Sequence, residues 1–104
     1  MSDEDLVQMA IKRRDAFDNL NEYLETIKGI VQEIDPNAEI YIFGSVPNKN
    51  YNYSSDIDVL IVTRIDPDKV RLELWQSGIR EPFEFHIYPP TKAARIKGNL
   101  VRVA

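Results

Sequence analysis

The sequence predicts one α/β or α+β domain over residues 1–104, with a small mixed sheet of three to four strands and helices packed on one face. Three observations lead to this prediction. Apolar residues in the first third recur at helical spacing. Residues 56–63 and 83–88 have the composition and pattern of strands. A helix start, Asp66-Pro67, stands between those two strands.

The first expected element is a long helix that ends at residues 35–37 (DPN), a helix-stopping sequence. Its apolar residues are three and four positions apart, which places them on one helix face: Phe17, Leu20, Leu24, Ile27, Val31 and Ile34. The same face is extended toward the start by Leu6, Met9 and Ala10. Ser2 to Asp5 resembles a capping box, so the helix should begin there.

The next expected elements are two strands joined by a polar loop. A short strand at Glu39 to Phe43 ends at Gly44-Ser45, and residues 46–55 form the loop. Asp56 to Thr63 is the strongest strand. Beyond its aspartates it is apolar on both faces, which predicts a central strand covered on both sides.

The last third begins with a helix, for which Asp66 is the expected N-cap and Gly78 the expected end. Phe83 to Tyr88 alternates apolar and polar residues and is the third predicted strand. The basic tail from Thr91 is expected to hold a short helix and a last strand at Leu100 to Val103.

Composition limits the chemistry that this chain can perform. It has no cysteine, which excludes disulfides, thiolate zinc sites and cysteine nucleophiles. One histidine argues against a multi-histidine metal site, so a metal would need oxygen ligands, as magnesium, manganese and calcium do. The net charge of −4 argues against broad, non-specific binding to nucleic acid. With no long apolar run and no basic leader, we expect a cytoplasmic protein.

The main candidate for a functional site is the pair Asp56 and Asp58 at the start of the central strand. Residues i and i+2 of a strand share a face, with Cα atoms roughly 6.6 Å apart, so their carboxylates can converge on one divalent cation. A cation would offset the repulsion between two carboxylates beside an apolar strand. The alternative, favoured for an isolated DxD, is that both side chains lie in solvent as turn residues.

The sequence upstream of Asp56 and Asp58 makes metal binding the favoured interpretation over turn residues in solvent. Gly44-Ser45 follows a hydrophobic strand, and ten residues separate Ser45 from Asp56. A glycine lets the backbone approach a ligand, and a serine adds a hydroxyl donor. Taken alone, Gly44 has an alternative interpretation as a plain turn between a strand and a loop. The sequence does not contain a Walker A loop.

Together, FGS at residues 43–45 and SDIDVLIV at residues 55–62 resemble the minimal nucleotidyltransferases of the DNA polymerase β-like superfamily. The resemblance covers most of the chain, from the first helix to about Tyr88. It implies a palm-like domain and Mg²⁺-dependent transfer of a nucleoside monophosphate from an NTP, such as ATP, to an acceptor hydroxyl. It also implies a two-metal site, in which Mn²⁺ could replace Mg²⁺.

The resemblance also assigns roles to residues. Gly44 and Ser45 would hold the phosphates of the NTP, and Asp56 and Asp58 would bind Mg²⁺. A third carboxylate is expected on a later strand, where Glu84 is the candidate; an exposed strand residue is the alternative. Glu81 is a weaker candidate because it precedes Pro82. His86 shares a strand face with Glu84, and a polar surface residue is the favoured interpretation for it.

One departure from the family pattern concerns the phosphate-binding cation. Relatives usually carry a basic residue, often arginine followed by glycine, shortly after the Gly-Ser pair. This chain has Lys49, which would act as a point charge without the fork of arginine. The alternative, which is favoured equally, is that Lys49 is a solvent-exposed lysine in a loop.

Two further questions concern partners. The resemblance implies that such short proteins often work with a separate helical partner, of the HEPN (higher eukaryotic and prokaryotic nucleotide-binding) type, in toxin–antitoxin pairs. The acceptor hydroxyl can then be a tyrosine of that partner. Apolar residues beside the main stripe of the first helix could serve such a partner or a homodimer, although a wider core-facing stripe is favoured: Ala16, Tyr23 and Ile30.

Two alternative functions stay open from the sequence. One is a non-catalytic antitoxin-type module that binds a partner protein. The other is a nucleotide- or RNA-binding domain that uses the basic tail, in which four cations follow Glu84 with no further acid.

Overall fold

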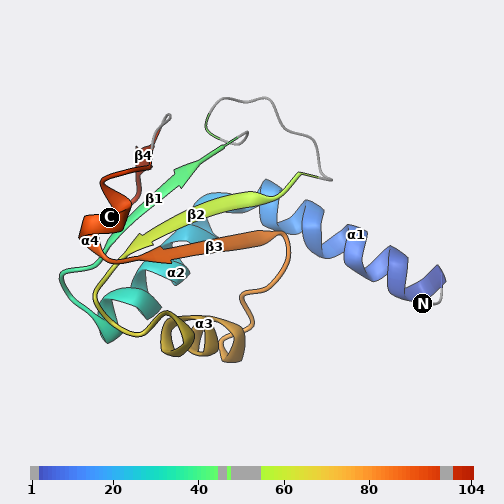
Figure 1. Ribbon diagram of the computed structural model, residues 1–104. Helices are drawn as coiled ribbons and strands as arrows, with labels where there is room; N and C mark the ends of the chain where they lie inside the picture. The colour runs from blue at the N-terminus through green and yellow to red at the C-terminus, as the bar shows by residue number, and fades with distance from the viewer. Residues whose placement is uncertain (1–2, 45–46, 48–54, 97–99) are drawn as a thin grey trace.

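The computed structural model describes residues 3–44, 47, 55–96 and 100–104 (Figure 1). Its helices are α1 (Asp3–Asp18), α2 (Leu20–Ile34), α3 (Pro67–Gln76) and α4 (Pro90–Ala93). Its strands are β1 (Glu39–Phe43), β2 (Ile57–Val62), β3 (Phe83–Tyr88) and β4 (Val101–Arg102). In the described parts of the chain, no helix is long and apolar enough to span a membrane.

The four strands form one mixed sheet in the order β3-β2-β1-β4. β1 is antiparallel to β2 and to β4, whereas β2 and β3 are parallel. β2 therefore lies inside the sheet, as its apolar sequence predicts. The register places Asp58 beside Phe43 on one side and beside Glu84 on the other.

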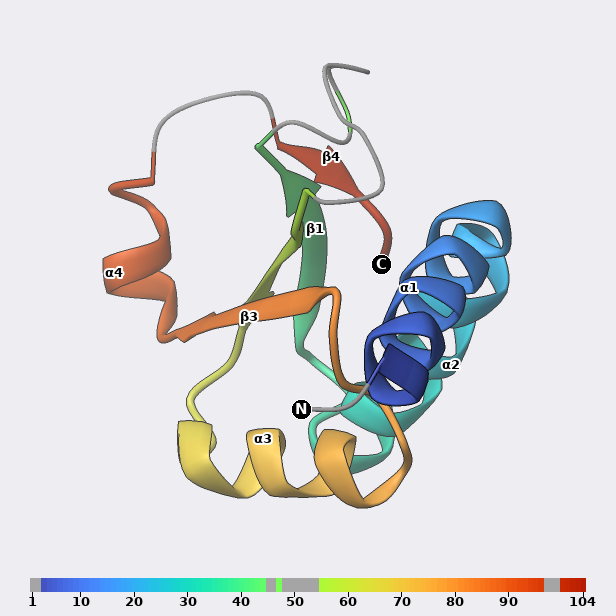
Figure 2. The ribbon, with the colours of Figure 1, turned by 90° about the vertical axis from the view of Figure 1, so that its right-hand side faces the viewer.

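The two faces of the sheet are covered unequally (Figure 2). α2 and α3 pack on one face, where alternate residues of β2 and β3 meet the helices: Ile57, Val59, Ile61, Phe83, Phe85 and Ile87. This confirms the predicted α+β fold. In addition, α4 lies on the opposite face, where Ala93 packs on Leu60 and Val62. These contacts explain why β2 is apolar on both sides near its end.

The expected long first helix is instead two helices that meet at Asn19, which has a non-helical backbone conformation (φ −119°, ψ 34°). The Nδ2 group of Asn19 donates hydrogen bonds to the backbone and side chain of Asp15. The backbone amide of Asn19 still donates to the Asp15 carbonyl, and Nδ2 shares that acceptor, so the break lies at a residue with weak helix propensity. The Tyr23 hydroxyl also donates to Asp15, and this hydrogen bond raises the pKa of Tyr23.

Because α1 projects beyond the sheet (Figure 1), most of it has no core to cover. Only Ala16 and Phe17 of α1 are buried. The prediction that Leu6, Met9 and Ala10 extend the buried face is wrong, since Leu6 and Met9 are 52% and 38% exposed and Ala10 is exposed as well. The core-facing interpretation of the residues beside the main stripe is confirmed: Ala16 is buried, and Tyr23 and Ile30 pack against the core.

The ends of α3 agree with the sequence. Asp66 is the N-cap, and its Oδ1 accepts a hydrogen bond from the amide of Asp68. Pro67 opens the helix, and Gly78, with φ of +87°, follows its end. The predicted cap at Ser2 lies outside the described residues.

Candidate active site

Gly44 and Asp58 meet where β1 ends. Gly44 has φ of +80°, a backbone conformation that favours glycine. A β-carbon at position 44 would lie 2.5 Å from Oδ2 of Asp58, closer than such atoms can approach. The aspartate carboxylate therefore lies directly against the backbone of the turn, and a side chain at position 44 would displace it.

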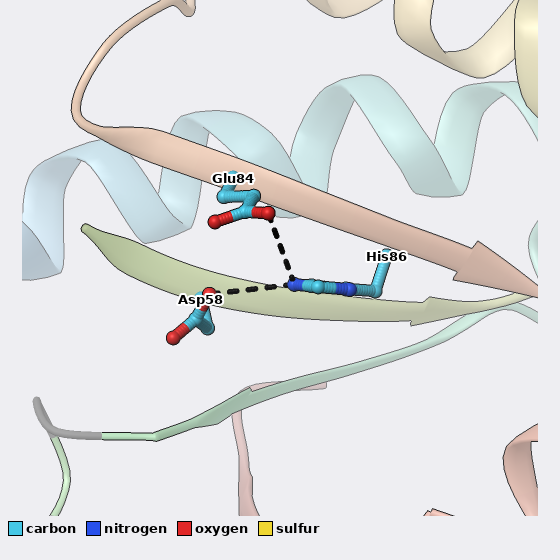
Figure 3. A group of neighbouring side chains, drawn as sticks. All are labelled: Asp58, Glu84 and His86. Carbon is cyan, nitrogen blue, oxygen red and sulfur yellow. Dashed lines mark hydrogen bonds and ion pairs between the residues drawn. The ribbon is translucent and has the colours of Figure 1, made fainter.

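Glu84 and His86 come from the neighbouring strand β3 and lie beside Asp58 (Figure 3). Asp58 and Glu84 are partners in the parallel register of β2 and β3. Nε2 of His86 is 3.3 Å from Oδ1 of Asp58 and 4.0 Å from Oε1 of Glu84. All three side chains extend from the sheet face opposite α2 and α3, because the alternate residues face those helices.

The donor atoms of this trio could hold a divalent ion. One ligand atom from each residue lies within 4.8 Å of the other two. Ligands about 2.0–2.2 Å from an ion stand roughly 3–4 Å apart, so only small side-chain movements are required. Two carboxylates suit Mg²⁺, and the imidazole adds a nitrogen ligand that Mn²⁺ accepts more readily. The donor set therefore fits a small divalent cation.

Asp56, the other predicted metal ligand, is outside this trio. Its side chain is 57% exposed, and Oδ1 lies 3.7 Å from the guanidinium of Arg13. Arg13 also donates a 2.6 Å hydrogen bond to the carbonyl of Ser55 and approaches Glu81 at 3.7 Å. α1 thus supplies a largely buried cation beside the start of β2.

The other predicted residues divide into two groups. The structure brings Gly44 and Glu84 to either side of Asp58, with the Glu84 side chain 55% exposed, whereas Asp56 lies apart from them. Ser45 and Lys49, the predicted phosphate-binding residues, lie outside the described residues.

His86 lies on the strand face of Glu84, as the sequence predicts, but it is less exposed than the favoured interpretation of a polar surface residue suggests. Its side chain is 27% exposed, and its ring packs edge-on against Phe43 with centroids 5.0 Å apart. The alternation of β3 places His86 on the same face as Glu84, and its contact with Asp58 depends on the pairing of β3 with β2.

An open cavity of about 490 Å³ lies farther along the same face of β3. Tyr88, Thr91, Lys92, Arg95 and Ile96 line it. Nζ of Lys92 is 4.3 Å from the centroid of the Tyr88 ring, and the rings of His86 and Tyr88 are 6.4 Å apart. The lining holds two cations and no acid, so the cavity suits an anionic group; its Tyr88 is about 13 Å along β3 from Glu84.

Comparison with known proteins agrees with this geometry. Residues 24–100 match the family described as "Nucleotidyltransferase domain". One crystal structure, of a presumed nucleotidyltransferase, is similar with a TM-score of 0.58 and 31% identity, over 79% of this chain and 98% of that chain. A second, a presumed nucleotidyltransferase from Sulfolobus solfataricus, has a TM-score of 0.52 and 26% identity, over 90% of this chain and 85% of that chain. No curated protein matches the sequence.

The family match covers β1, β2 and β3, and therefore includes every strand that contributes to the site. The predicted resemblance to minimal nucleotidyltransferases is thereby confirmed. The chain belongs to the nucleotidyltransferase domain family.

Proposed function

We propose that this nucleotidyltransferase moves a nucleoside monophosphate from an NTP to an acceptor hydroxyl, with Mg²⁺ or Mn²⁺ held by Asp58, Glu84 and Asp56. The observation that carries the proposal is the position of Asp58. Its carboxylate lies between the Gly44 turn and Glu84, where a bound ion could face both a triphosphate and an acceptor. When bound, the ion would neutralise phosphate charge and lower the pKa of the acceptor hydroxyl.

Asp56 lies at the edge of the site and is the third proposed ligand. The residue precedes β2, and its carboxylate is exposed and lies beside Arg13. Arg13 offsets the negative charge that Asp56 and Asp58 bring to the start of β2. Withdrawal of Asp56 from Arg13 would complete a three-carboxylate site.

The triphosphate is proposed to lie at the β1 side of the site. There the lack of a side chain at Gly44 would let a phosphate oxygen approach the backbone amides of the turn, beside the Asp58 carboxylate. Ser45 and Lys49 would add a hydroxyl and a positive charge, as the sequence predicts. The leaving pyrophosphate would then lie on the side of β1.

This arrangement assigns the acceptor to the β3 side, because in-line displacement places the entering oxygen opposite the leaving group. Glu84 and His86 line that side, and the basic cavity continues it. Lys92 and Arg95 favour an acceptor that carries negative charge near its hydroxyl, such as a nucleotide or a nucleic-acid end. The overall charge of −4 confines such binding to this local surface.

The direct test is incubation with Mg²⁺ and each labelled NTP, followed by mass spectrometry of the added nucleotidyl group. One arm offers oligonucleotide acceptors, and another offers a helical partner protein of the kind found in toxin–antitoxin pairs. Loss of transfer in Asp58→Asn and Glu84→Gln, with transfer kept in Asp68→Asn, supports the proposal. Transfer that survives in both site variants contradicts it.

The alternative of a nucleotide- or RNA-binding domain is favoured by the same cavity. This alternative differs from the proposed transferase because binding by the cavity does not require the carboxylates. Binding through Lys92 and Arg95 alone would weaken with salt and in Arg95→Glu, but would be unchanged in Asp58→Asn. An antitoxin-type module would instead retain a protein partner when both Asp56 and Asp58 are replaced.

A further inference from the structure

α1 carries apolar side chains that the described fold leaves in solvent. Val7 and Ile11 are each 55% exposed, and Leu6 is 52% exposed. The helix also lies outside residues 24–100, the part that matches the family. Three large aliphatic side chains on one short exposed helix are costly in water unless another surface covers them.

The arrangement of charges on α1 indicates which surface that is. Glu4, Val7, Ile11 and Arg14 follow one another at steps of three, four and three, so they form one stripe along the helix. We call these four residues the α1 stripe. Its ends carry opposite charges, and its centre is apolar. Such a stripe is complementary to itself when two copies run antiparallel.

The register follows from the spacing. A two-fold axis beside residue 9 places Glu4 of one copy opposite Arg14 of the other, and Val7 opposite Ile11. Both contacts occur twice, as a two-fold interface requires. Leu6 is outside the stripe, because adjacent residues of a helix lie about 100° apart around its axis, and it lies on the side of Phe17. Arg14 also pairs with Asp18 of its own helix at 3.5 Å, and the second copy would add Glu4 to the same guanidinium.

We propose that the protein forms a homodimer through antiparallel packing of the two α1 stripes. The 16 residues of α1 span about 24 Å, which accommodates the full register from Glu4 to Arg14. The contact area of one helix pair is at the small end for protein interfaces, so we expect the dimer to depend on protein concentration. The proposal is independent of the chemistry proposed above.

The test measures the oligomeric state of the full chain by analytical ultracentrifugation over a range of concentrations. The wild type should shift from monomer to dimer. In Glu4→Arg, the introduced arginine faces Arg14 of the other copy, which has the same charge. In Arg14→Glu, the introduced glutamate faces Glu4 of the other copy, again with the same charge. Each single variant should dissociate at least about tenfold more readily, since each has two repulsive contacts.

Mixing the two single variants, Glu4→Arg and Arg14→Glu, distinguishes this register from a general effect of charge. In the mixed pair, the arginine introduced at position 4 of one copy meets the glutamate introduced at position 14 of the other. The unchanged Arg14 of the first copy meets the unchanged Glu4 of the second, so both contacts are attractive again. The mixture should therefore form a heterodimer although neither variant forms a homodimer. Helix content by circular dichroism excludes unfolding of α1 as the cause of dissociation.

Apolar variants complete the design. Val7→Ser with Ile11→Ser should abolish the dimer, whereas Leu72→Ser, at an exposed leucine of α3, should leave it intact. A wild type that is monomeric at all concentrations overturns the proposal, and so does a dimer that is unaffected by the changes in α1. Failure of the mixed variants to associate overturns the antiparallel register.

Discussion

At the residue scale, the contact between Gly44 and Asp58 makes a specific prediction for Gly44→Ala. The new methyl group would lie 2.5 Å from the Asp58 carboxylate, and the positive φ disfavours alanine. We expect a loss of about 1–2 kcal/mol in the free energy of unfolding, measured in urea, and loss of nucleotidyl transfer. The carboxylate must move, and the ion site moves with it.

Gly78→Ala is the matched control for this variant. Gly78 has a similar positive φ of +87°, but no atom lies within 4 Å of its added β-carbon. The control should lose similar stability and keep full transfer. Equal activity in the two variants would mean that the close approach to Asp58 has no functional consequence.

Asp58→Asn separates chemistry from stability. The change removes a negative charge that faces Glu84 across the β2–β3 pair, so the free energy of unfolding should stay within about 1 kcal/mol of the wild type. Transfer should fall by at least about 100-fold, because an amide is a poor ligand for Mg²⁺. A strong decrease in melting temperature would instead assign Asp58 a structural role.

His86→Gln tests whether the imidazole nitrogen influences metal choice. Nitrogen ligands favour Mn²⁺ over Mg²⁺ more than amide oxygens do. The variant should therefore bind Mn²⁺ less tightly while its affinity for Mg²⁺ changes little, as measured by titration calorimetry. An unchanged ratio of the two affinities would place His86 outside the metal site.

At the element scale, the start of α3 offers a test of local stability. Asp66 caps the helix by accepting a hydrogen bond from the Asp68 amide. Asp66→Ala should lower the free energy of unfolding by about 1 kcal/mol, with transfer unchanged. Asp68→Ala keeps the cap and should cost less; equal losses would contradict the capping role.

The elements also indicate how far the sequence could predict the fold. Strand positions followed from composition, and the covered second face of β2 followed from its apolar run. The break at Asn19 did not follow, because apolar spacing continues across it from Phe17 to Leu24. The non-helical backbone conformation of Asn19 marks the break, and one asparagine within a helical pattern does not predict it.

At the scale of the whole molecule, the site contains residues that the sequence could predict and a contact that it could not. Gly44 and Asp58 were predictable from motif spacing, and Glu84 from the family resemblance, which implies a third carboxylate on a later strand. The contact of Arg13 with Asp56 joins residues distant in sequence and depends on the direction in which α1 leaves the break at Asn19. No local pattern in the sequence encodes that direction.

In the proposed site, Asp58 and Glu84 hold a divalent ion opposite the Gly44 turn. Electron paramagnetic resonance of Mn²⁺ tests it most directly, because free and bound Mn²⁺ give different signals and no acceptor is needed. We predict bound Mn²⁺ in the wild type and in Asp68→Asn, with binding at least about tenfold weaker in Asp58→Asn and Glu84→Gln. Equal Mn²⁺ binding by all four proteins would contradict the account.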